Sequence, residues 1–401
     1  MLNQIKKCRV CFSPKLVDIL DLGYQPPANN LHKNEKKQKK FPLKLIICKK
    51  CKLAQLSISL SPKKLFNNYF WVTGTSNAAK EHAKIFYDHT SKFIKKNNTI
   101  LEIASNDGTF LKPFLIKKYN VVGVDPAKNI SKLANKMGVK TIPHFFSNNL
   151  AKSIKKKYKN FSLIFARNVI PHVKNINSVV KGVSKLSDKD TVVAIEFHYA
   201  KFILKELQYD SIYHEHLFYF TIKTISQLFK KYNLYPFDVI LSPISGGSLV
   251  LLFSKKKLKK TKELKNYVRQ ENAAKLNQIA TWKKFSIKSK LHSNKFKNDI
   301  IKAFQKRGKL FGYGASARSS TLLNFCNLNQ NYFEFIIDKN PLKHSFYTPG
   351  TNIKIVSIKD VKNKIKDKHM VLLAWNFKKE VVKFMNKNNF KNKIILPIKK
   401  K

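Results

Sequence analysis

One stretch of the sequence, residues 99–111, restricts the fold more than any other. A short apolar run, residues 99–103, leads into small and polar residues, and an amphipathic run follows. This order predicts a strand, a tight loop and a helix. Asn106, Asp107 and Gly108 allow the loop backbone to turn sharply and to approach a ligand closely. The stretch therefore indicates an α/β fold with a ligand site at the carboxyl edge of a parallel sheet.

A second apolar run, residues 121–124, ends in Asp125. An acid at this place suits hydrogen bonds to ribose hydroxyls. A dinucleotide-binding loop needs three glycines, whereas this loop has only Gly108. S-adenosylmethionine carries no phosphate and tolerates acidic neighbours, so we expect it as the cofactor; the alternative is an ordinary crossover whose loop only turns the chain. The residues expected to bind the cofactor are Glu102, Ala104, Ser105, Asn106, Asp107, Gly108 and Asp125.

Residues 1–65 carry two cysteine pairs, each with two residues between the cysteines. Such pairs suit tetrahedral thiolate coordination of zinc and leave no open position for catalysis. A module of this size has little core, so the metal would contribute much of its folding free energy. The alternative is four unligated buried thiols. The expected zinc ligands are Cys8, Cys11, Cys48 and Cys51.

The chain is strongly basic, with 79 lysines and arginines against 23 acids and a formal net charge of +56. Nucleic-acid binding is one explanation of such a charge. However, only five of the bases are arginine, which sequence-specific readers of bases and phosphates favour, and the lysines are spread over every segment. We therefore expect no specific nucleic-acid partner, but we do expect anionic substrates to be attracted.

Residues 66–253 form the next expected domain. Within it, residues 99–253 alternate strands and helices and contain the densest group of titratable side chains in the chain. Residues 209–220 hold two histidines, two acids and three tyrosines. Such density is costly in a core and natural in a cleft. Aromatic residues upstream, among them Tyr69 and Trp71, either form a lid over a ligand or pack the domain junction. We expect strands at 99–104, 121–125, 161–166, 191–197 and 247–253.

The last third of the chain predicts a helical connector and a second Rossmann-like domain. Residues 254–306 are lysine-rich with apolar residues near helical spacing, which indicates two helices. Residues 307–401 begin with a strand, a glycine loop and a helix start. Gly312 and Gly314 open that loop, where helix amides could hold a phosphate, although a structural turn explains them equally well. Further strands are expected at 333–338 and 369–375.

These motifs, in this order, resemble the three-domain S-adenosylmethionine-dependent sugar C-methyltransferases, which act on nucleotide-linked 4-keto-deoxysugars. The resemblance covers nearly the whole chain. Beyond the cysteine pairs, it rests on residues 23–29, 101–108, 123–127, 168–173, 212–216, 246–249, 312–315, 349–351 and 374–377. It implies a zinc-binding domain, a Rossmann-like methyltransferase domain and a C-terminal Rossmann-like domain that binds most of the nucleotide sugar.

The resemblance also implies roles for particular residues. Tyr213, Glu215 and His216 would supply catalytic groups, His172 would be another active-site histidine, and Asn168 would join the cofactor site. Residues implied to bind the sugar nucleotide are Gly246, Gly247, Gly312, Tyr313, Gly314, Ala315, Arg318 and Asn376.

Three positions depart from the family pattern. Ala104 replaces a usual glycine. Trp71 lies near a usual active-site tyrosine, a role that Tyr69 takes or that is lost. Pro171 restricts the backbone of Ile170 before it.

The chemistry implied is the formation of a carbon–carbon bond next to a ketone. A base must remove the neighbouring proton, and a donor must stabilise the oxyanion that forms. Histidine has the right basicity near neutral pH. We expect His216 to be the base and Tyr213 the donor. Glu215 would orient His216 or act as an additional acid or base, and His172 would contact the sugar or relay the proton.

Two other functions stay open from the sequence. A methyltransferase acting on nitrogen or oxygen of another small molecule would leave the dense titratable cluster unexplained. A zinc-dependent nucleic-acid-binding protein with a degenerate methyltransferase core is opposed by the scarcity of arginine. No apolar run approaches the about 18 residues of a membrane helix, so we expect a cytoplasmic protein without a membrane partner, monomeric or weakly dimeric.

Overall fold

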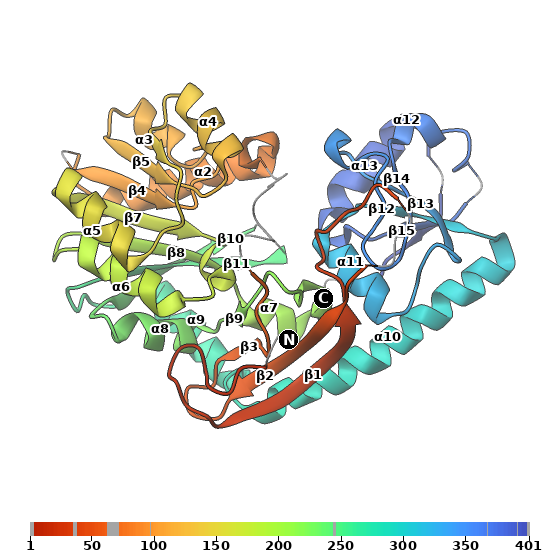
Figure 1. Cartoon of the computed structure of the whole chain (residues 1–401), viewed down its shortest axis with the longest axis horizontal. Coiled ribbons are helices and arrows are strands. Elements are labelled where there is room, and N and C mark those ends of the chain that lie inside the picture. The colour runs from red at the N-terminus through yellow and green to blue at the C-terminus, as the bar shows by residue number, and fades with distance from the viewer. Residues whose placement is uncertain are drawn as a thin grey trace.

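The computed structural model places two α/β lobes on either side of an antiparallel N-terminal sheet, and a long helix, α10, extends beneath β1 toward the C-terminal lobe (Figure 1). Tyr69 and Trp71 lie outside the described residues. Within the described part of the chain, no helix is both long and apolar enough to cross a lipid bilayer. The structure describes residues 4–34, 38–61, 72–96, 98–243, 246–366, 368–390 and 392–398.

The N-terminal sheet is completed by a strand from the middle of the chain. Its order is β1-β2-β3-β9, and all three neighbouring pairs are antiparallel. The last strand, β9, lies within the titratable cluster of residues 209–220, so the cysteine module and that cluster share one sheet. The strands are β1 (Leu16–Gln25), β2 (Phe41–Cys48), β3 (Ala54–Leu56) and β9 (Phe218–Tyr219).

The middle domain is a seven-stranded sheet of order β10-β11-β8-β7-β4-β5-β6. Five strands are parallel, while β10 and β11 join antiparallel at one edge. The parallel strands are almost entirely buried, as in sheets covered on both faces. All five strands expected here are confirmed, and β6 and β10 are additional. The bounds are β4 (Thr99–Ile103), β5 (Val121–Val124), β6 (Thr141–Ile142), β7 (Phe161–Arg167), β8 (Val192–His198), β10 (Tyr235–Ser242) and β11 (Ser248–Ser254).

Strand order reverses between β4 and β7, and this reversal locates the site. From β4 the chain proceeds to β5 and β6 on one side, then returns to β7 and β8 on the other. Ligands of open α/β sheets bind in the crevice at the carboxyl ends of strands where the order reverses. The loop after β4 therefore lies where a cofactor is expected.

Helices cover both faces of this sheet. On one face, aromatic rings of Phe86, Phe110, Phe114 and Phe165 pack edge to face or tilted. On the other face, α5 and α6 approach closely because Gly182 has no side chain to meet Ala151. The helices are α2 (Asn77–Thr90), α3 (Lys112–Ile116), α4 (Lys128–Lys136), α5 (Asn148–Lys157), α6 (Ile176–Leu186), α7 (Ala200–Lys205) and α8 (Ile222–Lys230), with short 3-10 turns η1 (Thr73–Thr75), η2 (Ser91–Phe93), η3 (Ile170–His172) and η4 (Tyr209–Ser211).

The connector consists of two helices, as predicted: α9 (Lys262–Ala273) and α10 (Ile279–Arg307). The 29 residues of α10 bury one stripe at spacings of three and four, and the lysines face solvent. Glu271 at the end of α9 is buried and accepts hydrogen bonds from the first two backbone amides of α8, Ile222 and Lys223, at 2.7 and 3.0 Å. A carboxylate at a helix N-terminus is favoured by the helix dipole, so this contact fixes the connector to the middle domain.

The C-terminal domain is a five-stranded parallel sheet of order β14-β13-β12-β15-β16, which confirms a second Rossmann-like fold. A side chain at Gly312 would collide with Ile336 and Leu373, so this glycine serves packing. The elements are β12 (Leu310–Tyr313), α11 (Ala317–Phe325), β13 (Phe333–Ile337), η6 (Pro341–Lys343), β14 (Ile355–Val356), α12 (Ile358–Val361), β15 (Met370–Leu372), η7 (Trp375–Phe377), α13 (Lys378–Lys387) and β16 (Ile394–Ile395).

Candidate active site and metal centre

The four cysteines of the N-terminal domain form one cluster, as predicted. Their sulfur atoms all lie within 4.8 Å of one another. Cys8 and Cys51 are 3.7 Å apart, and Cys11 and Cys48 are 3.5 Å apart. Zinc–sulfur bonds of about 2.3 Å in a tetrahedron place the sulfur atoms about 3.8 Å apart. The cluster therefore fits a closed, structural zinc site.

The two cysteine pairs sit on matching turns. In each, the residue after the second cysteine has a left-handed backbone, with φ of 60° at Phe12 and 65° at Lys52. Each of these residues donates its amide to the carbonyl of the first cysteine, at 3.0 Å in the first turn and 2.9 Å in the second. The Gln55 amide group donates to the sulfur of Cys8 at 3.2 Å. Backbone geometry thus orients the four sulfur atoms toward one another.

The loop after β4 turns through three left-handed residues: Ala104, Asn106 and Gly108, with φ of 56°, 50° and 79°. The amides of Ala104 and Ser105 both donate to the Val124 carbonyl, at 2.7 and 3.2 Å. A side chain at position 108 would collide with Val139. Since alanine pays a steric cost in this backbone region, the glycine usual at position 104 would fit with less strain.

Asp125 closes this loop. Its two carboxylate oxygens accept the amides of Asn106 and Ala127, both at 2.9 Å. The side chain is nearly buried, and burial raises its pKa. Each oxygen keeps a second lone pair, so the residue can hold the loop and still accept ribose hydroxyls.

The side chains of Asn106 and Asp107 hold the segment that precedes α2. The amides of Thr73 and Gly74 donate to Asn106 and Asp107, both at 2.9 Å. The side chains of Asn106 and Asp107 thus connect the loop after β4 to η1. A hollow of about 490 Å³ beside them is lined by residues that include Gly74, Asp107, Thr109, Leu133 and Met137.

Buried polar atoms beneath the loop fit a bound polar ligand. Among the described residues, the Ser105 hydroxyl and one Glu102 oxygen are buried without a hydrogen-bond partner. Burial raises the pKa of Glu102 well above its usual value. Asn168, expected at the cofactor, donates its side-chain amide to Glu196 at 3.1 Å. The unsatisfied atoms fit the polar ligand expected here, S-adenosylmethionine.

The titratable cluster brings Tyr213 and His216 together at the junction of the domains. The Tyr213 hydroxyl donates to Nε2 of His216 at 2.8 Å, and Nδ1–H of His216 donates to the Ser211 carbonyl at 2.9 Å. Burial, followed by the nearby His172 and His198, lowers the pKa of His216 well below its usual value. The ring is therefore neutral near pH 7, with the basic lone pair on Nε2.

Glu215 makes its side-chain hydrogen bond to a residue outside this pair. Its carboxylate accepts a hydrogen bond from the Asn29 side chain, and burial raises its pKa to about 7. The group that orients His216 is the Ser211 carbonyl, because it holds Nδ1. The role of Glu215 as an additional acid or base stays a prediction. Asn29 was not expected at the site, although it ends a loop that the family pattern includes.

Two further histidines lie beside His216. The His172 ring, in η3, is centred 4.8 Å from the His216 ring, and the His198 ring, at the end of β8, is centred 6.3 Å away. Burial lowers the pKa of His172 to about 4 and that of His198 to about 3. The sequence prediction missed His198. Its position at the carboxyl end of a parallel strand is the signal that could have found it.

The C-terminal domain reaches this cluster through Arg318. Its guanidinium donates to both oxygens of Asp210, at 2.8 and 3.1 Å, and to Gln208 at 3.0 Å. Gly246 lies against the same group, because a side chain there would stand 2.8 Å from Nη1 of Arg318. Arg318 and Gly246, both expected to bind substrate, are thus brought together, and the arginine already has an acidic partner.

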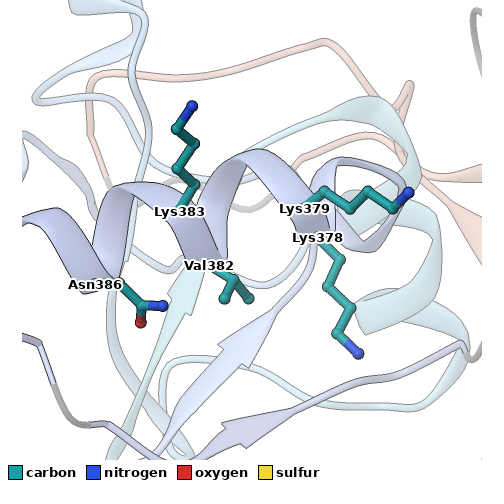
Figure 2. A pocket seen from close by; sticks show the side chains of 5 residues that line it. All are labelled: Lys378, Lys379, Val382, Lys383 and Asn386. Atoms are coloured by element: carbon teal, nitrogen blue, oxygen red, sulfur yellow. The ribbon is translucent and has the colours of Figure 1, made fainter.

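The other residues expected to bind substrate lie at the carboxyl end of the C-terminal sheet, except Gly247, which precedes β11 in the middle domain. Gly314 has φ of 97° and touches Ala374, while the Ala315 amide donates to Asp338 at 2.8 Å. Tyr313 ends β12, Asn376 lies in η7, and Gly247 packs on Phe202 of the middle domain. A hollow on α13 is lined instead by Lys378, Lys379, Val382, Lys383 and Asn386 (Figure 2), none of them a predicted site residue.

Family models match three successive parts of the chain. The model described as "Putative zinc binding domain" matches residues 8–66, "Methyltransferase domain" matches residues 77–238, and "C-methyltransferase C-terminal domain" matches residues 243–398. The C-methyltransferase NovU of Streptomyces niveus is 28% identical over 390 residues, which cover 95% of this chain and 92% of that protein.

Solved structures resemble part of the chain. The PH0226 protein from Pyrococcus horikoshii OT3 is 16% identical with a TM-score of 0.38, and it covers 48% of this chain and 98% of its own. Magnesium protoporphyrin IX methyltransferase from Synechocystis PCC 6803, with bound SAM, is 10% identical with a TM-score of 0.38 and covers 49% of this chain and 99% of its own.

The Rossmann-like fold, the loop after β4 and the family matches define this chain as an S-adenosylmethionine-dependent methyltransferase with a structural zinc site. The three matches follow one another in the order zinc-binding domain, methyltransferase domain and C-terminal domain. The chain thus has the domain arrangement of the three-domain C-methyltransferases, to which it is similar.

Proposed function

We propose that the protein methylates a carbon next to the ketone of a nucleotide-linked 4-keto-deoxysugar. The observation that carries this proposal is the hydrogen bond between the Tyr213 hydroxyl and Nε2 of His216, which lies between the cofactor domain and a second nucleotide-type domain. Methylation of nitrogen or oxygen needs no base that forms an enolate. A half-buried neutral histidine beside a phenol provides the base and the oxyanion donor that carbon methylation does need.

The Tyr213–His216 hydrogen bond suggests how the two groups act together. The Tyr213 hydroxyl donates to Nε2. A ketone oxygen that accepts this hydroxyl would free Nε2, so donor and base become available in one movement. Nε2 then takes the proton from the carbon next to the ketone, and the electron pair moves to the oxygen as the enolate forms. Tyr213 stabilises the negative charge on that oxygen.

S-adenosylmethionine, when bound, supplies the electrophilic methyl group. Glu102, Ser105 and Asp125 would hold it at the carboxyl edge of the middle sheet. The residues around Gly314 and Ala315 would hold the nucleotide part of the substrate, where the N-terminus of α11 favours anions. The chain thereby fixes both reactants and removes the entropy cost of their encounter.

The substrate class is tested by incubating the zinc-loaded protein with S-adenosylmethionine and a panel of thymidine-linked 4-keto sugars. Mass spectrometry should show a gain of one methylene in the sugar. A methyl group found on nitrogen or oxygen of the product, or no product from any 4-keto sugar, would contradict the proposal.

The base is tested by proton exchange in D2O without S-adenosylmethionine. His216→Asn keeps much of the side-chain volume and should lose methylation, together with any exchange that the wild type shows, by about 10²–10⁴-fold. His144→Asn, at an exposed histidine after β6, is the matched control. Wild-type methylation by His216→Asn would move the role of base to His172. Normal exchange without methylation would mean that His216 only positions the substrate.

A further inference from the structure

A buried carboxylate, Asp210, connects the catalytic segment, residues 209–216, to the C-terminal domain. It lies in η4, three residues before Tyr213, and is 1% exposed. Its oxygens accept hydrogen bonds from Nε and Nη2 of Arg318, at 3.1 and 2.8 Å, and from the indole Nε1–H of Trp375, at 2.8 Å. Both donors belong to the C-terminal domain, so the catalytic segment is held from the other side of the domain junction.

The arrangement of these three side chains favours a role in geometry over a role in stability. A buried ion pair adds little net stability, because both charges lose their hydration. The guanidinium, in contrast, donates two hydrogen bonds to the two oxygens of the Asp210 carboxylate and so fixes the orientation of that group. The guanidinium also lies 4.7 Å from the centre of the Trp375 ring. Arg318 and Trp375 therefore hold each other as well as Asp210.

The hydrogen bonds of η4 carry this constraint to the base. Ser211 follows Asp210 directly, and its carbonyl accepts Nδ1–H of His216 at 2.9 Å. The hydroxyl and the amide of Ser211 both donate to the Gln208 carbonyl, at 2.7 and 3.1 Å. Nη2 of Arg318 also donates to the Gln208 side chain at 3.0 Å. Arg318 thus contacts the residue that precedes η4 and the middle residue of η4, next to the Ser211 carbonyl.

We propose that Asp210, Arg318 and Trp375 are positioning residues that set the tautomer and the orientation of His216 through the Ser211 carbonyl. A proton fixed on Nδ1 leaves Nε2 as the basic atom, and only Nε2 faces Tyr213. The base is then complete only when the C-terminal domain is docked on the middle domain. The proposed catalytic role of His216 underlies the kinetic part of this inference, whereas the tautomer can be measured without any substrate.

The same geometry distinguishes two roles of Arg318. If its main task were to bind a substrate phosphate, its conservative replacement would raise KM for the sugar nucleotide. If Arg318 positions His216 through Asp210, its replacement by lysine lowers kcat. The KM for the sugar nucleotide and the KM for S-adenosylmethionine then change little. A misplacement of the reacting groups by about 1 Å can cost about 10²-fold in rate, so we expect kcat to fall by about tenfold to a hundredfold.

The experiment compares wild type with Trp375→Phe and Arg318→Lys. Trp375→Phe keeps an aromatic ring and removes one donor, and Arg318→Lys keeps the charge and removes the fork. Trp282→Phe is the matched control, because Trp282 is equally buried and donates its indole N–H to the Leu276 carbonyl at 2.9 Å within the connector. The first measurement is the nitrogen NMR spectrum of histidine-labelled protein without substrate, assigned to His216 by its loss in His216→Asn.

Wild type and Trp282→Phe should show the Nδ1–H tautomer of His216, and both Trp375→Phe and Arg318→Lys should shift or broaden this signal. Their kcat should fall while KM stays within about threefold. An unchanged His216 signal in either folded variant would overturn the inference, as would a loss confined to KM. If wild type shows the Nδ1–H tautomer but methylates no 4-keto sugar, the proposed function fails and the structural inference stands.

Discussion

Replacing Glu215 by glutamine should make the protein more stable above neutral pH and leave its stability in mild acid nearly unchanged. Burial raises the pKa of this carboxyl from 4.5 to about 7. Folding therefore favours the protonated form. The stability that this gives is complete below pH 4.5 and is lost as the pH rises to about 7. The pKa difference of about 2.5, at 1.36 kcal/mol for each unit, corresponds to about 3 kcal/mol.

Glutamine has nearly the shape of glutamate, keeps an oxygen that can accept from Asn29, and cannot ionise. Urea unfolding of zinc-loaded wild type and Glu215→Gln at pH 5 and pH 8 measures the effect. The variant should exceed wild type by about 2–3 kcal/mol at pH 8 and by less than 1 kcal/mol at pH 5. Other titratable groups change the free energy of unfolding of wild type and variant equally, so their effect cancels in the difference at each pH. Glu81→Gln, at an exposed glutamate of α2, should stay within about 0.5 kcal/mol of wild type at both pH values.

Two outcomes would refute this reasoning. A stability difference that is equal at pH 5 and pH 8 would mean that Glu215 does not titrate between them in the folded protein. A variant less stable at pH 8 would mean that the carboxylate is ionised and bound by more donors than Asn29 alone.

Three further predictions concern the bound groups. Purified protein should contain one zinc per chain, and chelation should free the thiols and unfold the N-terminal sheet; less than about half an equivalent of zinc with all four thiols titratable would reject the metal site. Asp125→Ala should weaken S-adenosylmethionine binding by about 1–3 kcal/mol in calorimetry, and unchanged affinity would exclude this placement of the ribose. Gly314→Val should raise KM for the sugar nucleotide and leave cofactor affinity intact, whereas an equal loss of both would indicate unfolding, since a side chain there meets Ala374.

Features encoded within a few neighbouring residues could be predicted from the sequence. The cysteine pairs need only two-residue spacings, and the turns around Phe12 and Lys52 bring them together. The strand, loop and helix around Gly108 follow from local hydrophobicity and turn residues. Tyr213 and His216 are three positions apart, so one turn of chain is enough to join them.

Contacts between distant residues could not be predicted in this way. Asn29 and Glu215 are 186 positions apart, and Trp375 and Asp210 are 165 apart. Nothing local distinguishes these side chains from others of their type, because their partners are set by domain docking. The partner of His216 shows the same limit: its Nδ1 is held by the backbone carbonyl of Ser211, which no residue pattern marks.

The pairing of β3 with β9 has a consequence for the order in which the protein matures during synthesis. Ala54 and Gln55 pair with Tyr219 and Phe218, and the Leu56 amide donates to the Leu217 carbonyl at 3.0 Å. All four cysteines leave the ribosome long before these partners exist. Zinc can therefore be captured early, but the sheet keeps an open edge until residue 219 has been made. If the N-terminal module of this protein were transferred to a relative, residues 217–219 would have to be transferred with it. They supply the last strand of the N-terminal sheet.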